Sequence, residues 1–134
     1  MTTRPNPKIA LGPVDSSCAL VLCDMGQPDS PVVYASDPFY QLTGYTADEV
    51  IGQNCRFLQA PGGKVRKSGS RKHVDKTVLR QLRKAVDKKT EAQVEITNFK
   101  KNGTSFTNFL TIVPVSWDDS HNYFVGFLCD KDDV

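Results

Sequence analysis

The sequence is poor in the residues that build disulfide frameworks, metal sites and membrane spans. It has four cysteines and two histidines in 134 residues, and their uneven spacing fits neither a secreted disulfide framework nor a zinc site. No apolar run reaches membrane-spanning length, and residues 1–5 lack the apolar region of a secretion signal. We therefore expect one soluble domain without a metal, in the reducing environment of the cytoplasm, the nucleus or both.

Charge of one sign is concentrated in one part of the chain, although the net charge is only +2. Residues 64–89 contain eleven lysines and arginines against two aspartates. Such a run is most often a solvated loop and helix face, and we favour that interpretation. A phosphate-bearing ligand or a nucleic acid would also fit the charge. Nucleic acid is the weaker alternative, because the run has no helix-turn-helix or zinc-finger pattern and no aromatic residue on which a base could stack.

The order of turn signals and hydrophobic periods predicts an α+β domain. The hydrophobic period is helical over 74–86 and becomes alternating from residue 92 onward. We expect strands over 18–23, 31–35, 92–99, 106–115 and 123–129, helices over 36–44, 47–51, 54–58 and 74–86, and a polar loop over 117–122. This order predicts a five-stranded antiparallel sheet with short helices and one longer helix packed on one face. Residues 1–15 are expected to form an extended segment before a domain over 16–134.

Two asparagines are expected to point into the core of this sheet. Asn98 continues an apolar alternation that begins at Ala92, and Asn108 has the same parity as its apolar neighbours at 106 and 110. Buried amides without partners cost free energy, so a polar-edged ligand between the two would stabilise them. Five aromatic side chains are expected to belong to the core, namely Phe39, Tyr40, Phe57, Phe109 and Phe124.

The segment GQNCRFLQ at residues 52–59 places a cysteine near the start of a short helix. The preceding residues TADE at 46–49 have the form of a capping box, which prepares a helix just upstream. Free backbone N–H groups in a first helical turn, together with the neighbouring Arg56, favour a thiolate at Cys55. We interpret Cys55 as a thiol held for chemistry or for a ligand, and Cys18, Cys23 and Cys129 as small hydrophobic residues.

The same eight residues closely match the signature of the LOV (light-oxygen-voltage) domains, the flavin-binding blue-light sensors of the PAS superfamily. The resemblance extends over almost the whole chain and implies a PAS fold. The long loop after Gln59 and the segments 4–7 and 11–15 are most similar to the small fungal blue-light photoreceptors typified by Vivid and Envoy. In those relatives an N-terminal cap rearranges in light, and residues 1–15 would be part of such a cap.

The resemblance assigns three residues to the flavin ring. Cys55 would be the thiol whose sulfur bonds to flavin C4a after blue-light excitation. Asn98 and Asn108, on neighbouring strands, would bond to the pyrimidine edge of the ring, which agrees with the inward orientation expected from their parity.

Four further residues are assigned to the rest of the cofactor. Asn54 and Gln59 would bond to polar atoms of the flavin or its ribityl chain, and Arg56 and Arg83 would pair with its phosphate. The cofactor is expected to be FAD or FMN. FAD is favoured because the long basic loop after Gln59 is able to cover its adenylate, whereas FMN would leave that loop without a ligand.

One position departs from the family pattern. The last expected strand has Leu128 two residues after Gly126, where LOV domains usually have a glutamine that contacts flavin N5 and O4. Leu128 would still point at the ring, but leucine neither donates nor accepts a hydrogen bond. We expect adduct formation to persist, with a dark absorption band shifted to the blue, an altered adduct lifetime, and weakened or rerouted signalling.

The resemblance implies a blue-light photoreceptor that switches through a reversible cysteinyl–flavin bond, and not an enzyme that turns over a substrate. Output would come from altered packing of the N-terminal segment, a light-dependent homodimer, and contact with a PAS- or LOV-containing transcription regulator in a fungus. Two other classes stay open: a redox or flavin sensor without a light cycle, and a PAS interaction module with an empty pocket. Nucleic-acid binding by residues 64–89 is weaker still and predicts a steep dependence on salt.

Overall fold

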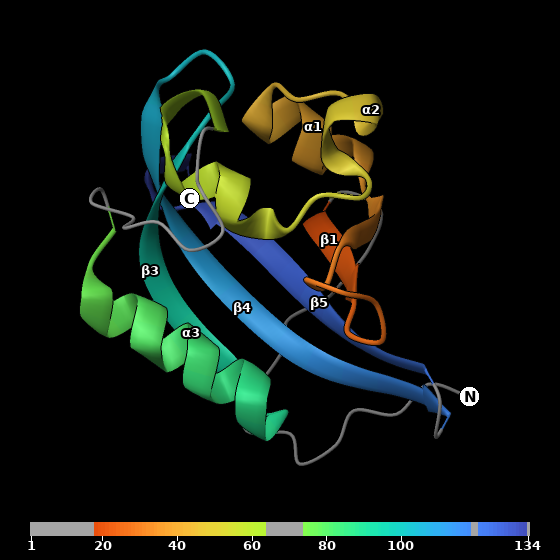
Figure 1. The fold of residues 1–134 in the computed structure, drawn as a ribbon. Coiled ribbons are helices and arrows are strands. Elements are labelled where there is room, and N and C mark those ends of the chain that lie inside the picture. The colour runs from red at the N-terminus through yellow and green to blue at the C-terminus, as the bar shows by residue number, and fades with distance from the viewer. Residues whose placement is uncertain (1–17, 64–73, 119–120, 134) are drawn as a thin grey trace.

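The computed structural model describes residues 18–63, 74–118 and 121–133. Within them, antiparallel strands form one five-stranded sheet in the spatial order β2-β1-β5-β4-β3 (Figure 1). The strands are β1 Ala19–Asp24, β2 Val32–Ala35, β3 Ala92–Phe99, β4 Ser105–Asp118 and β5 His121–Asp130. The last strand, β5, lies between β1 and β4, so residues from both ends of the domain meet at the centre of the sheet. The predicted five-stranded antiparallel α+β architecture is confirmed.

Short helices and one longer helix cover one face of the sheet (Figure 1). The α-helices are α1 Asp37–Thr43, α2 Ala47–Val50 and α3 Lys76–Lys88, and the 3₁₀ segments are η1 Cys55–Gln59, η2 Pro61–Gly63 and η3 Lys131–Asp133. The helix α3 packs along β3, whereas α1 packs against β1.

Ser36 determines where α1 begins and ties that helix to β1. Its hydroxyl accepts hydrogen bonds from the Phe39 and Leu20 N–H groups, at 3.4 and 2.9 Å, and donates one to the Cys18 carbonyl at 2.9 Å. The helix ends at Gly44, whose φ of 79° is left-handed and therefore favours glycine. The helix predicted over 36–44 is confirmed, with Ser36 and Gly44 as its two caps.

The core lies between the helices and the sheet, and Phe39, Val32 and Val50 are fully buried in it. Phe57 and Phe124 are also buried, as predicted, and Tyr40 is half-buried. The expectation that Phe109 belongs to the core is wrong, because 41% of its surface is exposed. Side chains alternate between the two faces of a strand, so the inward position of Asn108 turns its neighbour Phe109 to the outer face.

The polar loop predicted over 117–122 is also wrong, because the two long strands extend into it. Ser116 pairs with Asn122 and Asp118 with His121 in the β4–β5 ladder. Polar side chains support this pairing: the His121 Nδ1 and Asp118 Oδ1 atoms lie 2.7 Å apart, and Ser116 donates to Asn122 at 3.1 Å. Cross-strand pairs of this kind stabilise a solvated hairpin end whose composition resembles a loop.

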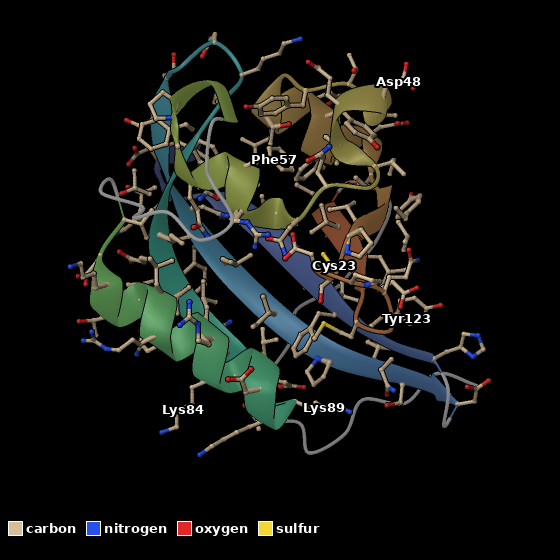
Figure 2. The ribbon with its side chains drawn as sticks, in the orientation of Figure 1. Cys23, Asp48, Phe57, Lys84, Lys89 and Tyr123 are labelled. Carbon is tan, nitrogen blue, oxygen red and sulfur yellow. The ribbon has the colours of Figure 1, made fainter. Side chains whose placement is uncertain are left out.

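The N-terminal segment 1–15 and the basic loop at 64–73 lie outside the described residues. The described part of the basic run is on α3 and its C-cap residue Lys89, and Lys84 points away from the sheet (Figure 2). Among the helices that are described, none is long and apolar enough to cross a membrane.

Candidate functional site

A cavity of about 240 Å³ lies between the sheet, η1 and α3. Its lining is mostly apolar, with side chains from four strands and from α3. The residues with polar or thiol side chains in the lining are Ser30, Asn54, Arg56, Gln59, Asn98, Asn108, Cys23 and Cys55. Small-molecule sites usually enclose roughly 300–1,000 Å³ and combine an apolar lining with a few convergent polar groups. The cavity has this composition, and its volume lies slightly below this range.

The centre of the sheet leaves room for this cavity because β5 has a glycine there. A Cβ atom at Gly126 would lie 3.2 Å from Cγ2 of Val21 on β1 and 3.7 Å from Cδ1 of Leu110 on β4. Two residues further along β5, Leu128 lines the same cavity with 7% of its surface exposed. Its predicted position facing the ring site therefore agrees with the structure.

Asn54 caps the 3₁₀ segment η1 and fixes its position. Its Oδ1 accepts a hydrogen bond from the Arg56 N–H at 3.0 Å, and its Nδ2 donates to the Asp29 carbonyl at 2.8 Å. Asp29 has a left-handed φ of 64° in the turn after β1. The cap thus joins the cysteine-bearing segment to a turn that is far away in sequence.

The guanidinium group of Arg56 pairs with the carboxylate of this same Asp29. The sequence analysis missed Asp29, because nothing in the turn of residues 25–30 indicates a contact with η1. The pairing neutralises Arg56, so a phosphate bound there would compete with Asp29. The phosphate role of Arg56 stays a prediction, with Asp29 added as its competitor.

Cys55, in the first turn of η1, is in contact with a second cysteine. Its Sγ atom lies 3.6 Å from the Sγ atom of Cys23 on β1, and Cys23 lies close beneath η1 in Figure 2. The hydrogen bond with Cys23, together with burial, raises the pKa of the Cys55 thiol well above its usual range. The same bond stabilises a Cys23 thiolate and so lowers the pKa of Cys23, against the opposing effect of burial.

The prediction of a Cys55 thiolate is therefore wrong. The charge of Arg56 is already paired with Asp29, and η1 is a short 3₁₀ segment, so neither feature outweighs burial and the Cys23 contact. At neutral pH Cys55 is a protonated thiol. Cys23, interpreted from sequence as a simple hydrophobic residue, lines the cavity beside it.

The two asparagines of the sheet point inward as predicted, and their exposed fractions are 3% for Asn98 and 1% for Asn108. Asn108 donates to the Asn98 Oδ1 at 2.9 Å and accepts from the Cys129 N–H at 3.1 Å. Asn98 donates to the Thr97 carbonyl at 3.0 Å. Protein partners therefore offset part of the cost of burial. Each amide group has capacity for further hydrogen bonds, so the contact with a ligand stays a prediction.

Gln59, at the end of η1, gives the clearest indication of a polar ligand. The residue lines the cavity. Its Oε1 atom is buried and has no hydrogen-bond partner among the described residues. Leaving a buried acceptor unpaired costs about 1–3 kcal/mol. A ligand N–H or O–H group in the cavity would satisfy it. A flavin fits this set of residues, because its ring is flat and apolar on its faces and polar along one edge.

Comparison with known proteins identifies the family. A family model described as a PAS domain matches residues 17–131. The chain is 46% identical over 131 residues to the blue light receptor lreA of Aspergillus flavus and 43% identical over 131 residues to the White collar 1 protein of Neurospora crassa. A solved structure of the light-state dimer of the fungal blue-light photoreceptor Vivid is 55% identical, with a TM-score of 0.87 over 94% of this chain and 86% of that one. The chain belongs to the LOV photoreceptors of the PAS family.

The two curated LOV relatives are much longer than this chain. Each match covers 97% of the chain but only 15% of lreA and 11% of White collar 1. The similarity to these two proteins is therefore confined to one domain of each. The activities and partners of the longer proteins come to this chain only as proposals.

Of the LOV residues predicted from sequence, the cavity brings seven together and leaves one outside. The seven in its lining are Asn54, Cys55, Arg56, Gln59, Asn98, Asn108 and Leu128. Arg83 is exposed on α3, whose Leu82 and Val86 side chains face the cavity instead. A phosphate role for Arg83 stays a prediction that requires the phosphate to lie beyond the cavity.

Proposed function

We propose that this chain is a blue-light photoreceptor domain in which the Cys55 sulfur forms a reversible bond to C4a of a bound flavin. The observation that carries the proposal is that Cys55 lines one small apolar cavity together with the amides of Gln59, Asn98 and Asn108, in a chain of the LOV family. A bound flavin supplies the absorption of blue light and the excited state with which a thiol reacts.

The residues of the chain would hold the thiol and the ring in place. The Asn54 cap fixes η1 and hence the position of the Cys55 sulfur. Because Cys55 is protonated, this one residue carries both the sulfur and the proton that are needed for the bond to C4a and the proton on N5. The apolar lining keeps water away from the sulfur, which favours reaction with the ring over side reactions. No substrate is turned over, so we regard the domain as a sensor and not as an enzyme.

The cofactor is proposed to be FAD or FMN, with its ring in the cavity and its phosphate near Arg56. The ring would lie among the cavity residues, and the rest of the cofactor would extend from it past Arg56. Denaturing the purified protein and separating the released flavin by chromatography distinguishes the two. Pure FMN would remove the argument that the loop after Gln59 covers an adenylate.

Output is proposed to be a change in protein association. The light-state dimer of Vivid supports a light-dependent homodimer here. The partner would be a transcription regulator with a PAS or LOV domain, similar to White collar 1. The residues at 1–15 would be the moving surface. All four cysteines carry free thiols, which fits the proposed location in the cytoplasm or the nucleus. Light scattering of dark and illuminated protein tests the dimer.

Absorption spectroscopy tests the photochemical proposal. The spectrum is recorded in the dark, after blue illumination and during recovery, for the wild type and for Cys55→Ala. We expect a structured blue band that bleaches and returns, and that does not bleach in Cys55→Ala. The exposed Cys129 provides a matched control, because Cys129→Ala should bleach as the wild type does.

The outcomes separate the functional classes. A flavin band that light leaves unchanged would overturn the photoreceptor proposal in favour of a redox or flavin sensor. A colourless protein would leave a PAS interaction module with an empty pocket.

A further inference from the structure

We propose that Cys23 and Cys55 form a reversible intramolecular disulfide when the protein meets a peroxide, and that this bond withdraws the Cys55 thiol from the light reaction. The second part rests on the proposed function, whereas the first part concerns only the two thiols. The pair is thus proposed as a modification site inside the ring cavity.

The two sulfur atoms are placed for this bond by separate elements of the fold. Their separation of 3.6 Å is a direct contact with no atom between them. A disulfide needs a separation of about 2.05 Å, so the sulfurs would have to approach by roughly 1.5 Å. Side-chain rotation is able to supply such a movement, because both residues are half-buried and border a cavity.

The ladder of β1 is irregular at the position of Cys23. The pairing register between β1 and β2 shifts between Leu22 and Cys23. Irregularities of this kind redirect a side chain and are frequent beside functional sites. On the other side, the Asn54 cap fixes the first turn of η1 and therefore Cys55. The contact between the cysteines is thus determined at both ends by local backbone structure.

The two thiols differ in the way that a peroxide reaction requires. The hydrogen bond from Cys55 favours the thiolate of Cys23, whereas Cys55 keeps its proton. Thiolates and not thiols attack peroxides. Cys23 is therefore the attacking residue and Cys55 the resolving residue.

The reaction balances in two steps. The Cys23 sulfur attacks one oxygen of hydrogen peroxide, an S–O bond forms, the O–O bond breaks, and the released hydroxide is protonated to water. The Cys55 sulfur then attacks the Cys23 sulfenic sulfur, the S–S bond forms, the S–O bond breaks, and the leaving hydroxide takes the Cys55 proton. Two thiols and one peroxide thus give one disulfide and two waters. A thiol reductant reverses the change through a mixed disulfide.

The consequence for the sensor is a loss of bleaching without loss of the flavin. In the disulfide the Cys55 sulfur has no proton and its bonding capacity is occupied by Cys23. Illumination would then leave the blue band unchanged, in proportion to the fraction of protein that carries the disulfide. Reduction would restore the bleaching.

The test combines peptide mass spectrometry with spectroscopy on the flavin-loaded full chain. The protein is treated with hydrogen peroxide in the dark, remaining thiols are blocked, and digested peptides are searched for the Cys23–Cys55 linkage. Bleaching is measured on the same samples before treatment, after treatment and after reduction. Cys23→Ser is compared with its own untreated sample, and Cys129→Ser serves as the control with an exposed cysteine removed.

We expect the linked peptide and a matching loss of bleaching in the wild type and in Cys129→Ser, both reversed by reductant. Cys23→Ser should keep its own bleaching at the same dose of peroxide. Equal loss of bleaching in Cys23→Ser, or no linkage at a dose that oxidises Cys129, would overturn the proposal. A linked protein that still bleaches fully would overturn its functional part. An untreated wild type that never bleaches would instead refute the photoreceptor function. Mass spectrometry would still detect the Cys23–Cys55 linkage in that case.

Discussion

Replacing Leu128 by glutamine should destabilise the protein without flavin much more than the protein with flavin. Leu128 is 7% exposed, so nearly all of its side chain is removed from water. It lies opposite Leu110 in the β4–β5 ladder, and both side chains line the cavity. The substitution Leu128→Gln therefore places an amide in the position from which the usual LOV glutamine would reach the ring.

The magnitude follows from two costs and one gain. Losing the burial of a leucine side chain costs at most about 1.5–3 kcal/mol. Burying an amide without partners adds about 1–3 kcal/mol. A flavin offering N5 and O4 would satisfy the amide and cancel much of the second cost. The flavin-free variant should thus lose about 1–3 kcal/mol more free energy of unfolding than the flavin-loaded variant.

Denaturant unfolding of both forms measures this difference, and the dark spectrum gives a second readout. We expect the blue band of Leu128→Gln to shift to longer wavelength, because the ring gains a hydrogen bond, and the adduct lifetime to change. Leu128→Met is the matched control, since it keeps the volume and adds no polar group that bonds well. An equal loss of stability in both forms, with an unchanged band, would refute the proposed contact between this side chain and the ring.

Two further predictions concern the ends of η1 and α2. Gln59→Leu removes the unpaired buried Oε1, so it should stabilise the flavin-free protein by about 1–3 kcal/mol while weakening flavin affinity, and a stabilisation of both forms alike would contradict a ligand contact. Glu49→Gln tests pH dependence: the hydrogen bond from Lys101, followed by the bond from the Thr46 N–H, lowers the pKa of Glu49 from its ordinary value of 4.5. The carboxylate therefore contributes stability above pH 4.5 that is lost as pH falls through the lowered pKa. Wild type should be the more stable protein at neutral pH and equal to Glu49→Gln in strong acid, and a difference that persists in acid would exclude this cause.

Much of the fold could be predicted because its signals are local. The alternation around Asn98 predicted β3, and a second strand was expected soon after it, at 106–115. The structure joins β3 to β4 as a hairpin with a left-handed φ of 91° at Gly103. The helix expected over 36–44 agrees with α1 and its two capping residues. The loop predicted over 117–122 was wrong because composition does not show which residues pair across strands. At the end of β4, polar residues of loop-like composition pair with β5.

The candidate site was predicted in its members but not in its contacts. Parity along β3, β4 and β5 placed Asn98, Asn108 and Leu128 on one face, and a contiguous segment provided Asn54 to Gln59. The outlying Arg83 shows the limit of this reasoning, because its assignment depended on resemblance alone and the side chain lies outside the cavity.

What the sequence by itself determined was therefore the identity of the cysteine-bearing segment, the family and the inward faces of the strands. Only the tertiary structure decided the partners. It brought Asp29 to Arg56 and Cys23 to Cys55, and these contacts changed the protonation expected for the thiol. The physical reason is that the pKa and the pairing of a buried group depend on atoms a few ångströms away in space, and the sequence separates those atoms by a whole turn, a strand and two helices.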